Sequence, residues 1–237
     1  MKKTIKIVHL YYDLMNLYGE NGNISALKRF IERQGVQVKI DRLTLGDKID
    51  FEAYDFYYMG SGIEESMDLV LADLYNYKDD IKTSIENGKM YLITGNAMNL
   101  FGRKMKLKNG KNVDCLGIFD YNATCSNTRL VGEIYYEFPT LPEGKGRNLI
   151  GFKNTDFNIV NNDGCRPFGP QDNINYKNFF AMSFFGPVLI RNPYFTDYLL
   201  NILFESKNLE YKEDDEAIEY KAYHQFVKNF IENANLD

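Results

Sequence analysis

Short apolar segments alternate with amphipathic ones along the N-terminal half of the chain. Apolar runs that suit buried parallel strands lie at 5–12, 36–43, 54–59 and 90–94. Apolar residues recur at helical spacing in 24–31 and 81–86, and Gly35 and Gly88 follow where those helices should end. Acidic residues from Glu64 onward suit the first turn of another helix. This alternation of strands and helices predicts a parallel, doubly wound sheet that binds ligands at the carboxyl ends of its strands.

The pattern changes after Gly102. Asn109-Gly110 is a strong hairpin signal, and 129–138 alternates as a strand does. A second β pair is expected to include 149–152 and 157–160. Segment 161–177 is rich in Gly, Pro and Asn and is predicted to be a loop, a candidate lid. A strand at 179–185 and helices at 195–204 and 217–231 follow. We therefore expect an α/β fold of three layers: a mostly parallel, doubly wound sheet with helices on both faces, and added β-hairpin or antiparallel strands in the C-terminal half.

Composition narrows the class of protein only slightly. With 237 residues and 44% hydrophobic content the chain can bury one α/β core, and a net charge of −5 argues against a nucleic-acid partner. Three cysteines without a CxxC pair favour reduced thiols. Because no signal-type segment follows Met1 and no long apolar run occurs, we expect a cytoplasmic protein without membrane insertion. Two isolated histidines make no metal signature, and we expect neither a metal nor a cofactor.

The segment 90–102 carries the strongest functional signal. An apolar strand runs into the small residues Gly95, Asn96 and Ala97, which open an apolar helical segment closed by Gly102. Such a strand–turn–helix layout raises one side chain above the end of a sheet and directs backbone N–H groups at a neighbouring oxyanion. The raised position should be Gly95, which has no atom that can attack a substrate.

This segment resembles the Cys-Gly-Gly-Tyr-Gln-x-x-Gly elbow of class I glutamine amidotransferases of the cobyric acid synthase type. Four further blocks resemble that family in the same order: 16–23, 60–62, 126–129 with Gly132, and 185–187 followed by 196–200. The resemblance covers about 5–205 and is nearest to the glutaminase subunit of lipid II isoglutaminyl synthase. It implies an amidotransferase-like domain at 1–207, with 208–237 as an acidic linker and a C-terminal helix packed on that domain or on a partner.

Two departures from the family pattern remove its chemistry. The alignment places Gly95 at the nucleophilic cysteine and Phe185 at the catalytic histidine, and the polar segment at 152–156 has also drifted. Glutamine hydrolysis needs a thiolate and a base that returns its proton to the leaving ammonia. Losing either costs several orders of magnitude in rate. We therefore assign no catalytic residue.

Some alternatives to lost catalysis remain open. If the alignment is shifted, Thr94 is the nucleophile, and Cys115 or Cys125 could instead enter the pocket. His9 is expected in the core or at the pocket edge, and His224 is expected to face solvent or a partner. A side chain of Cys, Ser or Thr at the apex of the elbow would favour a working enzyme.

The resemblance also implies a set of substrate-binding residues. Arg129 matches an arginine that contacts the glutamine carboxylate, with a surface arginine as the plain alternative. Gly60, Ser61 and Gly62 retain backbone donors that could hold an anion, and Asn96, which follows Gly95 in the elbow, is a further candidate. The block at 16–23, which begins at Asn16, shapes the pocket rim or merely caps a helix.

Three functional hypotheses follow. The first is a degenerate subunit that does not hydrolyse glutamine and that acts as scaffold or regulator of a Mur-ligase-like, ATP-dependent partner. In that family the glutaminase supplies ammonia, and the partner amidates the D-glutamate carboxyl of the peptidoglycan stem. The second is an active glutaminase with an unusual nucleophile, which serves lipid II or cobyric-acid-type amidation. The third is a module that binds glutamine or another small carboxylate.

Overall fold

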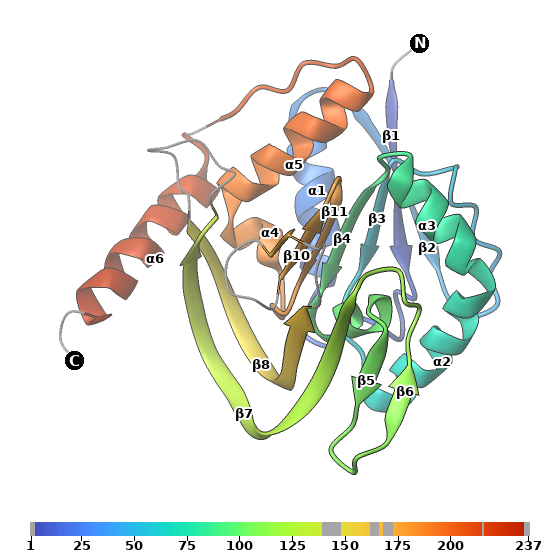
Figure 1. Ribbon diagram of the computed structural model, residues 1–237. Coiled ribbons are helices and arrows are strands. Elements are labelled where there is room, and N and C mark those ends of the chain that lie inside the picture. Colours follow the sequence, from blue (N-terminus) through green and yellow to red (C-terminus); the bar gives the residue numbers. More distant parts are fainter. Residues whose placement is uncertain (1–2, 139–147, 162–165, 168–172, 215, 235–237) are drawn as a thin grey trace.

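The computed structural model describes residues 3–138, 148–161, 166–167, 173–214 and 216–234 (Figure 1). Its main sheet runs in the order β2 (Gln37–Leu43), β1 (Thr4–Leu10), β3 (Phe56–Met59), β4 (Met90–Thr94), β11 (Phe179–Met182), β10 (Ile174–Tyr176) and β9 (Arg166–Pro167). The first five strands in this order are parallel, and β10 and β9 extend the sheet antiparallel. The mostly parallel sheet predicted from the sequence is confirmed.

Helices cover both faces of this sheet (Figure 1). Side chains of α1 (Asn21–Arg33), α4 (Val188–Arg191) and α5 (Pro193–Ser206) form one apolar core, and those of α2 (Glu64–Leu74) and α3 (Lys78–Glu86) form the other. Successive strand residues divide between the two cores, as alternation requires. Tyr57 faces α2 and α3, where its ring stacks 4.5 Å from that of Tyr91, whereas Tyr58 faces α1. The three-layer arrangement is therefore as predicted.

The elbow after β4 has the predicted turn, and the predicted helical segment is present as a 3₁₀ helix. Gly95 has φ +62°, a left-handed conformation that side chains other than glycine rarely adopt. The following residues, Gly95–Phe101, form a 3₁₀ helix (η2) that ends at Gly102. Close packing explains the glycine at this position, since a Cβ on Gly102 would lie 2.6 Å from the Tyr121 ring.

A second sheet follows, in the order β6 (Asn112–Asp114), β5 (Lys104–Lys106), β7 (Tyr121–Glu137) and β8 (Asn148–Asn161). Gly110 adopts φ +83° in the turn between β5 and β6, so the predicted hairpin is confirmed. The strands β7 and β8 form a long, curved antiparallel pair, with a register shift between Cys125 and Leu130 (Figure 1). The predicted strand segments 129–137, 149–152 and 157–160 lie in this pair, but 149–152 and 157–160 belong to the single strand β8, and both strands are much longer than predicted.

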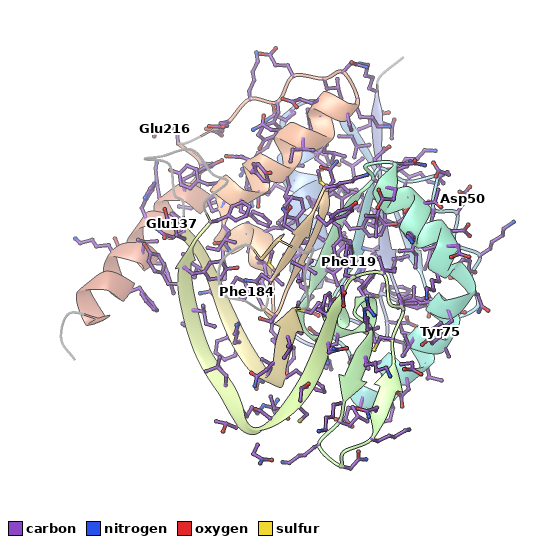
Figure 2. The ribbon with its side chains drawn as sticks, in the orientation of Figure 1. Asp50, Tyr75, Phe119, Glu137, Phe184 and Glu216 are labelled. Atoms are coloured by element: carbon purple, nitrogen blue, oxygen red, sulfur yellow. The ribbon has the colours of Figure 1, made fainter. Side chains whose placement is uncertain are left out.

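The two sheets meet beside β11. Phe185 donates its backbone N–H to the Phe152 carbonyl of β8 at 2.9 Å. Phe184 lies beneath β8 in the interior (Figure 2), so close that a Cβ on Gly151 would lie 2.4 Å from its ring. Because Gly151 leaves that space, β8 can approach the main sheet at the site where β11 ends.

The loop predicted at 161–177 is partly wrong. β9 and β10 lie within it, and β10 pairs antiparallel with β11 through a tight turn in which Lys177 has φ +50°. Ile174 is fully buried, and this burial holds a short strand in a segment whose composition favours a loop. The remaining parts of the predicted lid, 162–165 and 168–172, lie outside the described residues.

The C-terminal helix α6 (Ile218–Ala234) is tied to the domain by polar contacts. The buried carboxylate of Glu219 accepts hydrogen bonds from the guanidinium of Arg33, the shortest at 2.9 Å. The Tyr223 hydroxyl donates to the Asn148 carbonyl of β8 at 2.8 Å. No helix within the described ranges is both long and apolar enough to cross a bilayer.

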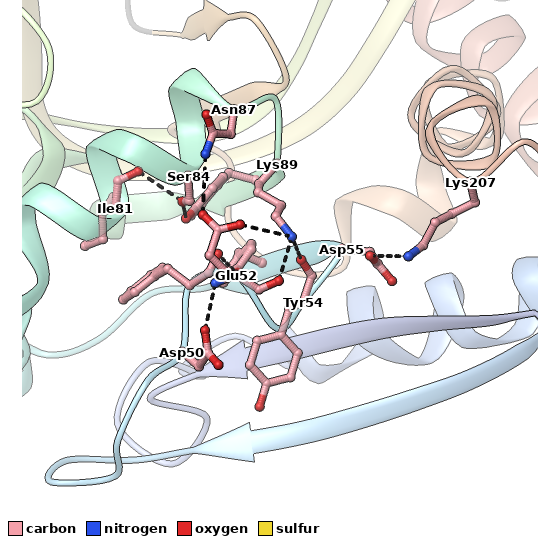
Figure 3. Close-up of polar contacts among 12 residues, drawn as sticks. Asp50, Glu52, Tyr54, Asp55, Ile81, Ser84, Asn87, Lys89 and Lys207 are labelled. Atoms are coloured by element: carbon pink, nitrogen blue, oxygen red, sulfur yellow. Dashed lines mark hydrogen bonds and ion pairs between the residues drawn. The ribbon is translucent and has the colours of Figure 1, made fainter.

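Ion pairs and hydrogen bonds brace the opposite end of the sheet, at the amino ends of β3 and β4. Figure 3 shows the Lys89 ammonium donating to the carbonyl oxygens of Glu52 and Tyr54, at 2.8 and 2.9 Å. Lys207 pairs there with Asp55 at 2.6 Å. Ligands of such sheets bind at the other end, in the loops that follow the carboxyl ends of the parallel strands.

Candidate functional site

Four loops that are distant in sequence meet at the carboxyl ends of the parallel strands, and the Glu20 carboxylate joins them. It accepts hydrogen bonds from the backbone N–H of Ser61 at 2.5 Å, from the Ser61 hydroxyl at 2.8 Å and from the Thr94 hydroxyl at 3.3 Å. The backbone N–H of Gly186 also acts on it. Glu20 is fully buried at the start of α1. Burial raises its pKa to about 7, although these donors oppose the shift.

A second buried layer supports the first. Asn23 donates from its side-chain nitrogen to the Tyr58 hydroxyl at 2.8 Å and to the Gly186 carbonyl at 3.2 Å, and its oxygen accepts from the Leu189 N–H at 2.9 Å. The Tyr58 hydroxyl lies 2.9 Å from that of Thr94. The side chains of Asn23, Tyr58 and Thr94 beneath the elbow are thus hydrogen-bonded within the protein, whereas Nδ2 of Asn99 in η2 is buried without a hydrogen-bond partner among the described residues.

The apex of the elbow is filled by a side chain from another loop. A Cβ added to Gly95 would lie 1.8 Å from the Ser61 Oγ and 3.1 Å from Cε1 of Phe185. No side chain fits at position 95 while Ser61 holds this rotamer. Ser61 itself is 0% exposed. Position 95 is therefore not merely empty, because the Ser61 hydroxyl occupies the space where a nucleophile's side chain would begin.

The Asn96 side chain is hydrogen-bonded to the backbone of Gly62, beside the apex. Its Oδ1 accepts from the Gly62 N–H at 3.1 Å, and its Nδ2 donates to the Gly62 carbonyl at 2.7 Å. Gly60 is equally constrained, because a Cβ there would lie 2.5 Å from Oε2 of Glu20. The predicted residues Gly60, Ser61, Gly62 and Asn96 are brought together, but as partners of one another.

A cavity of about 300 Å³ lies next to the elbow. Gly62, Asn96, Arg129 and Phe185 line it, whereas Ser61 and Gly95 lie behind its wall. Phe185 is 8% exposed, and its ring packs edge-to-face on that of Tyr18 at 4.8 Å. The position aligned with the catalytic histidine therefore carries an aromatic wall without a titratable group.

Arg129 reaches the cavity from the second sheet. Its Nε donates to Oδ1 of Asn154 at 2.7 Å, and the Asn154 amide donates to the Tyr18 hydroxyl at 3.2 Å. The arginine is exposed and lines the cavity. It therefore remains a candidate for binding a carboxylate.

The alternative nucleophiles lie away from the apex or are poorly activated. Thr94 is buried in the network of Glu20 and Tyr58. Burial raises the pKa of the Cys115 thiol to about 12, and burial with the nearby Asp156 carboxylate raises the pKa of Cys125. A raised pKa disfavours the thiolate, which is the nucleophilic form.

The remaining polar candidates have structural surroundings. His9 is buried against Tyr58, and burial lowers its pKa to about 4, so that the ring is neutral at pH 7. His224 lies on α6 with Nε2 2.8 Å from the Tyr194 hydroxyl. Asn16 accepts the Asn21 N–H at 2.9 Å, at the start of α1. Among the described residues no group of three His, Cys, Asp or Glu is placed to hold a metal.

Glu20 gives the site a measurable pH dependence. Its pKa is higher in the folded chain than in the unfolded one, so the folded state binds more protons between the ordinary value of 4.5 and about 7. The free energy of unfolding should therefore fall as pH rises through this window, by about 2–3 kcal/mol from this group, and level off above it. Urea denaturation from pH 5 to pH 8 measures this slope. In Glu20→Gln the slope should flatten, and an unchanged slope in the variant would assign it to other groups.

The sheet order, the glycine elbow and the loops around it define the fold of a class I glutamine amidotransferase. Solved structures agree. One glutamine amidotransferase matches with a TM-score of 0.53 at 16% identity, over 83% of this chain and 98% of that one. Another, from Thermotoga maritima, matches with a TM-score of 0.52 at 10% identity, over 96% and 98%.

Sequence comparison places the chain within one family of that class. Residues 6–179 match the model of the CobB/CobQ-like glutamine amidotransferase domain, so the chain belongs to this family. It is 30% identical to the Lipid II isoglutaminyl synthase (glutamine-hydrolyzing) subunit GatD of Streptococcus pneumoniae, over 79% of this chain and 76% of that protein. It is 28% identical to the subunit of the same name from Staphylococcus aureus, over 98% and 96%.

Sequence reasoning did not find Glu20 or the part that Ser61 plays. The available signal was a paired change: by the resemblance, Ser61 stands in the middle of a loop that is Gly-Gly-Gly in the family, and Gly95 stands at the family's nucleophile. A side chain gained in one loop and lost in the facing one suggests that the two positions share a space.

Proposed function

We propose that the chain is a non-hydrolysing glutamine amidotransferase-like subunit, a pseudoenzyme. The observation that carries this proposal is the Ser61 hydroxyl, which lies 1.8 Å from where the Cβ of any residue at position 95 would be. A glutaminase needs a nucleophile at that apex, a base to take its proton and a donor for the oxyanion. Here Ser61 fills the space of the nucleophile, and Phe185 stands where the base would be. The Gly62 N–H, which could serve as an oxyanion donor, is hydrogen-bonded to the Asn96 side chain.

The polar side chains at the elbow form a hydrogen-bonded network, which supports a retained role for this part of the protein. Random loss of function leaves cavities and unpaired groups, each of which costs stability. In this chain the Glu20 carboxylate, the Ser61 hydroxyl and the Asn96 amide have hydrogen-bond partners within the protein. Such a closed network keeps the four loops in place and thereby keeps the surface around the cavity.

The names of the relatives support a partner subunit. Both curated relatives are named as subunits of lipid II isoglutaminyl synthase. We infer that this chain forms a heterodimer with a Mur-ligase-like, ATP-dependent subunit in the cytoplasm and acts as its scaffold or regulator in peptidoglycan modification. Exposed apolar side chains support a docking face: Leu17, Tyr18 and Ile63 line the cavity, and Leu130 and Val131 follow Arg129 on β7.

The role is tested by the nitrogen source that the complex uses. The chain co-expressed with its ligase partner should support ATP-dependent amidation of the D-glutamate carboxyl from ammonium but not from glutamine. The amidated product is measured by mass spectrometry, with the ligase alone as control. Equal amidation from glutamine would contradict a non-hydrolysing subunit, and equal ammonium-dependent amidation by the ligase alone would contradict the scaffold role.

One observation favours a second candidate, an active glutaminase, because a serine side chain, that of Ser61, does reach the apex of the elbow, as expected of a working enzyme. The Ser61 hydroxyl donates to Glu20 at 2.8 Å, and a carboxyl with a pKa of about 7 is suited to general-base work. In that reaction Ser61 would form a glutamyl ester while its proton passed through Glu20 to the leaving ammonia, and water would then hydrolyse the ester. The complete burial of Ser61 behind the Phe185 wall argues against it.

A further inference from the structure

The hairpin of β5 and β6, residues 104–114, is basic although the chain as a whole is acidic. It contains one acidic residue and four lysines: Lys104, Lys106, Lys108 and Lys111. The hairpin therefore carries a charge of +3, and because the whole chain carries −5, the remainder carries −8. We call residues 104–114 the lysine hairpin. Figure 1 shows its turn at the lower edge of the molecule, beyond the main sheet.

The four lysines are exposed, and three of them have no ion-pair partner. The Lys104 ammonium lies 3.6 Å from the Asp114 carboxylate, and both side chains are open to solvent, where such a pair contributes little. Within the described part of the chain, no ion pair is formed by the other three: Lys106, Lys108 and Lys111. Their charge is therefore available to an anionic partner.

The alternation of β5 turns its lysines away from the cavity beside the elbow. Met105 and Leu107 line that cavity. Lys104 and Lys106 alternate with them along the chain and therefore lie on the opposite face of the second sheet. On that face the register gives Lys106 uncharged neighbours: Asn112 on β6 and Thr124 on β7. A partner that covered the cavity would leave this lysine-bearing face open.

On the cavity side the turn of the hairpin meets charges of both signs. Burial, Asp156 and Glu64 raise the pKa of the Cys125 thiol, and the Lys108 ammonium opposes that shift. The positive excess of the hairpin therefore lies on its outer face and at its turn, and not toward the cavity.

These features suit an extended anionic surface better than a protein or a nucleic acid. Protein interfaces are depleted in lysine and enriched in aromatic residues and arginine, and sites for single-stranded nucleic acids add aromatic rings. The lysine hairpin has neither an aromatic residue nor an arginine. A lysine ammonium is a hydrated point charge on a flexible stem, which attracts phosphate without a fixed geometry. Clusters of about four to eight basic residues are typical of binding to anionic lipids.

We propose that the lysine hairpin attaches the protein peripherally to an anionic phospholipid surface, without insertion. Each lysine near such a surface strengthens binding about fivefold, so four together strengthen it about 10²- to 10³-fold. Screening limits these forces to about 8–10 Å, so the hairpin acts on the surface while the acidic remainder disfavours other orientations. The inference goes beyond the proposed function and does not depend on it, because no residue of the elbow takes part.

Co-sedimentation of the full chain with lipid vesicles tests this proposal. Vesicles of equal parts phosphatidylglycerol and phosphatidylcholine should bind the chain at least about tenfold more tightly than vesicles of phosphatidylcholine alone, and added salt should weaken the binding. The hairpin variant should bind the anionic vesicles at least about 10²-fold more weakly. It combines four changes: Lys104→Gln, Lys106→Gln, Lys108→Gln and Lys111→Gln. Arginine at the same four positions should preserve binding.

The matched control removes the same charge from four exposed lysines on other elements: Lys6→Gln, Lys48→Gln, Lys82→Gln and Lys221→Gln. Lys221 lies 3.8 Å from Glu216, an exposed pair like that of Lys104 with Asp114. This control should bind anionic vesicles within about threefold of the natural chain, because its lysines lie beyond the range of screened attraction when the hairpin meets the surface.

Three results would overturn the inference. Equal binding to anionic and neutral vesicles, or an equal loss in the hairpin and control variants, would mean that the hairpin does not recognise an anionic surface. Competition by soluble glycerol phosphate would indicate a site for a single phosphate group. Absence of vesicle binding, together with failure of the hairpin variant to co-purify with the ligase partner, would assign the hairpin to a protein interface.

Discussion

Gly95→Ala should destabilise the protein by about 2–5 kcal/mol, and Ser61→Gly introduced into that variant should recover about half of the loss. Two costs add in the single variant. A left-handed φ of +62° costs alanine about 1–2 kcal/mol, and forcing its methyl group against the Ser61 Oγ adds about 1–3 kcal/mol. Removing the Ser61 side chain relieves only the second cost. Urea denaturation of the four proteins in this double-mutant cycle measures the coupling directly.

Gly35→Ala is the matched control for the backbone term. Gly35 has φ +73° with no atom within 4 Å of an added Cβ, so its replacement carries the conformational cost without the collision. The difference between the two alanine variants is the packing cost at the elbow. Additive effects of Gly95→Ala and Ser61→Gly would mean that Ser61 does not occupy the apex.

The second large effect is a gain of activity. The variant Ser61→Gly with Gly95→Cys and Phe185→His should release ammonia from glutamine at least about 10²-fold faster than the natural chain, because it restores both a nucleophile and a base. The variant that lacks only Ser61→Gly should stay inactive, since its cysteine collides with the Ser61 hydroxyl. Adding Asn96→Gly should raise the rate further by freeing the Gly62 N–H.

The control for this gain is Ser61→Gly with Phe185→His, which has space and base but no nucleophile. It should match the natural chain. Ammonia release by this control, or by the variant that keeps Ser61, would show that the apex is not what limits the chemistry. Circular dichroism of each variant confirms that the comparison is made between folded proteins.

Most of the fold could be predicted from local patterns of apolar residues and glycines in the sequence. The strand β4 and the helix α3 follow apolar runs that end at Gly95 and Gly88, where a left-handed residue was needed. The short strands β9 and β10 were not predicted, because their stability comes from pairing with β11 and not from their own composition. The lengths of β7 and β8 were likewise set by pairing with each other.

The candidate site was predictable in part for a similar reason. Gly95 and Phe185 stand out in single segments, because each occupies a motif position that carries chemistry. The contact of Glu20 with Ser61 joins residues 41 positions apart, and no local pattern reveals a hydrogen bond between two loops. The sequence shows only that Gly95 has no side chain. The structure shows that the Ser61 side chain occupies the space where a side chain at position 95 would begin.

Ammonia release from glutamine by the purified natural chain, alone and with the proposed ligase partner, shows whether this subunit hydrolyses glutamine. Ser61→Ala is assayed in parallel. We expect no release above the buffer control by either protein, with or without the partner. Release by the natural chain that Ser61→Ala abolishes would contradict this expectation and would identify Ser61 as the nucleophile of a working glutaminase.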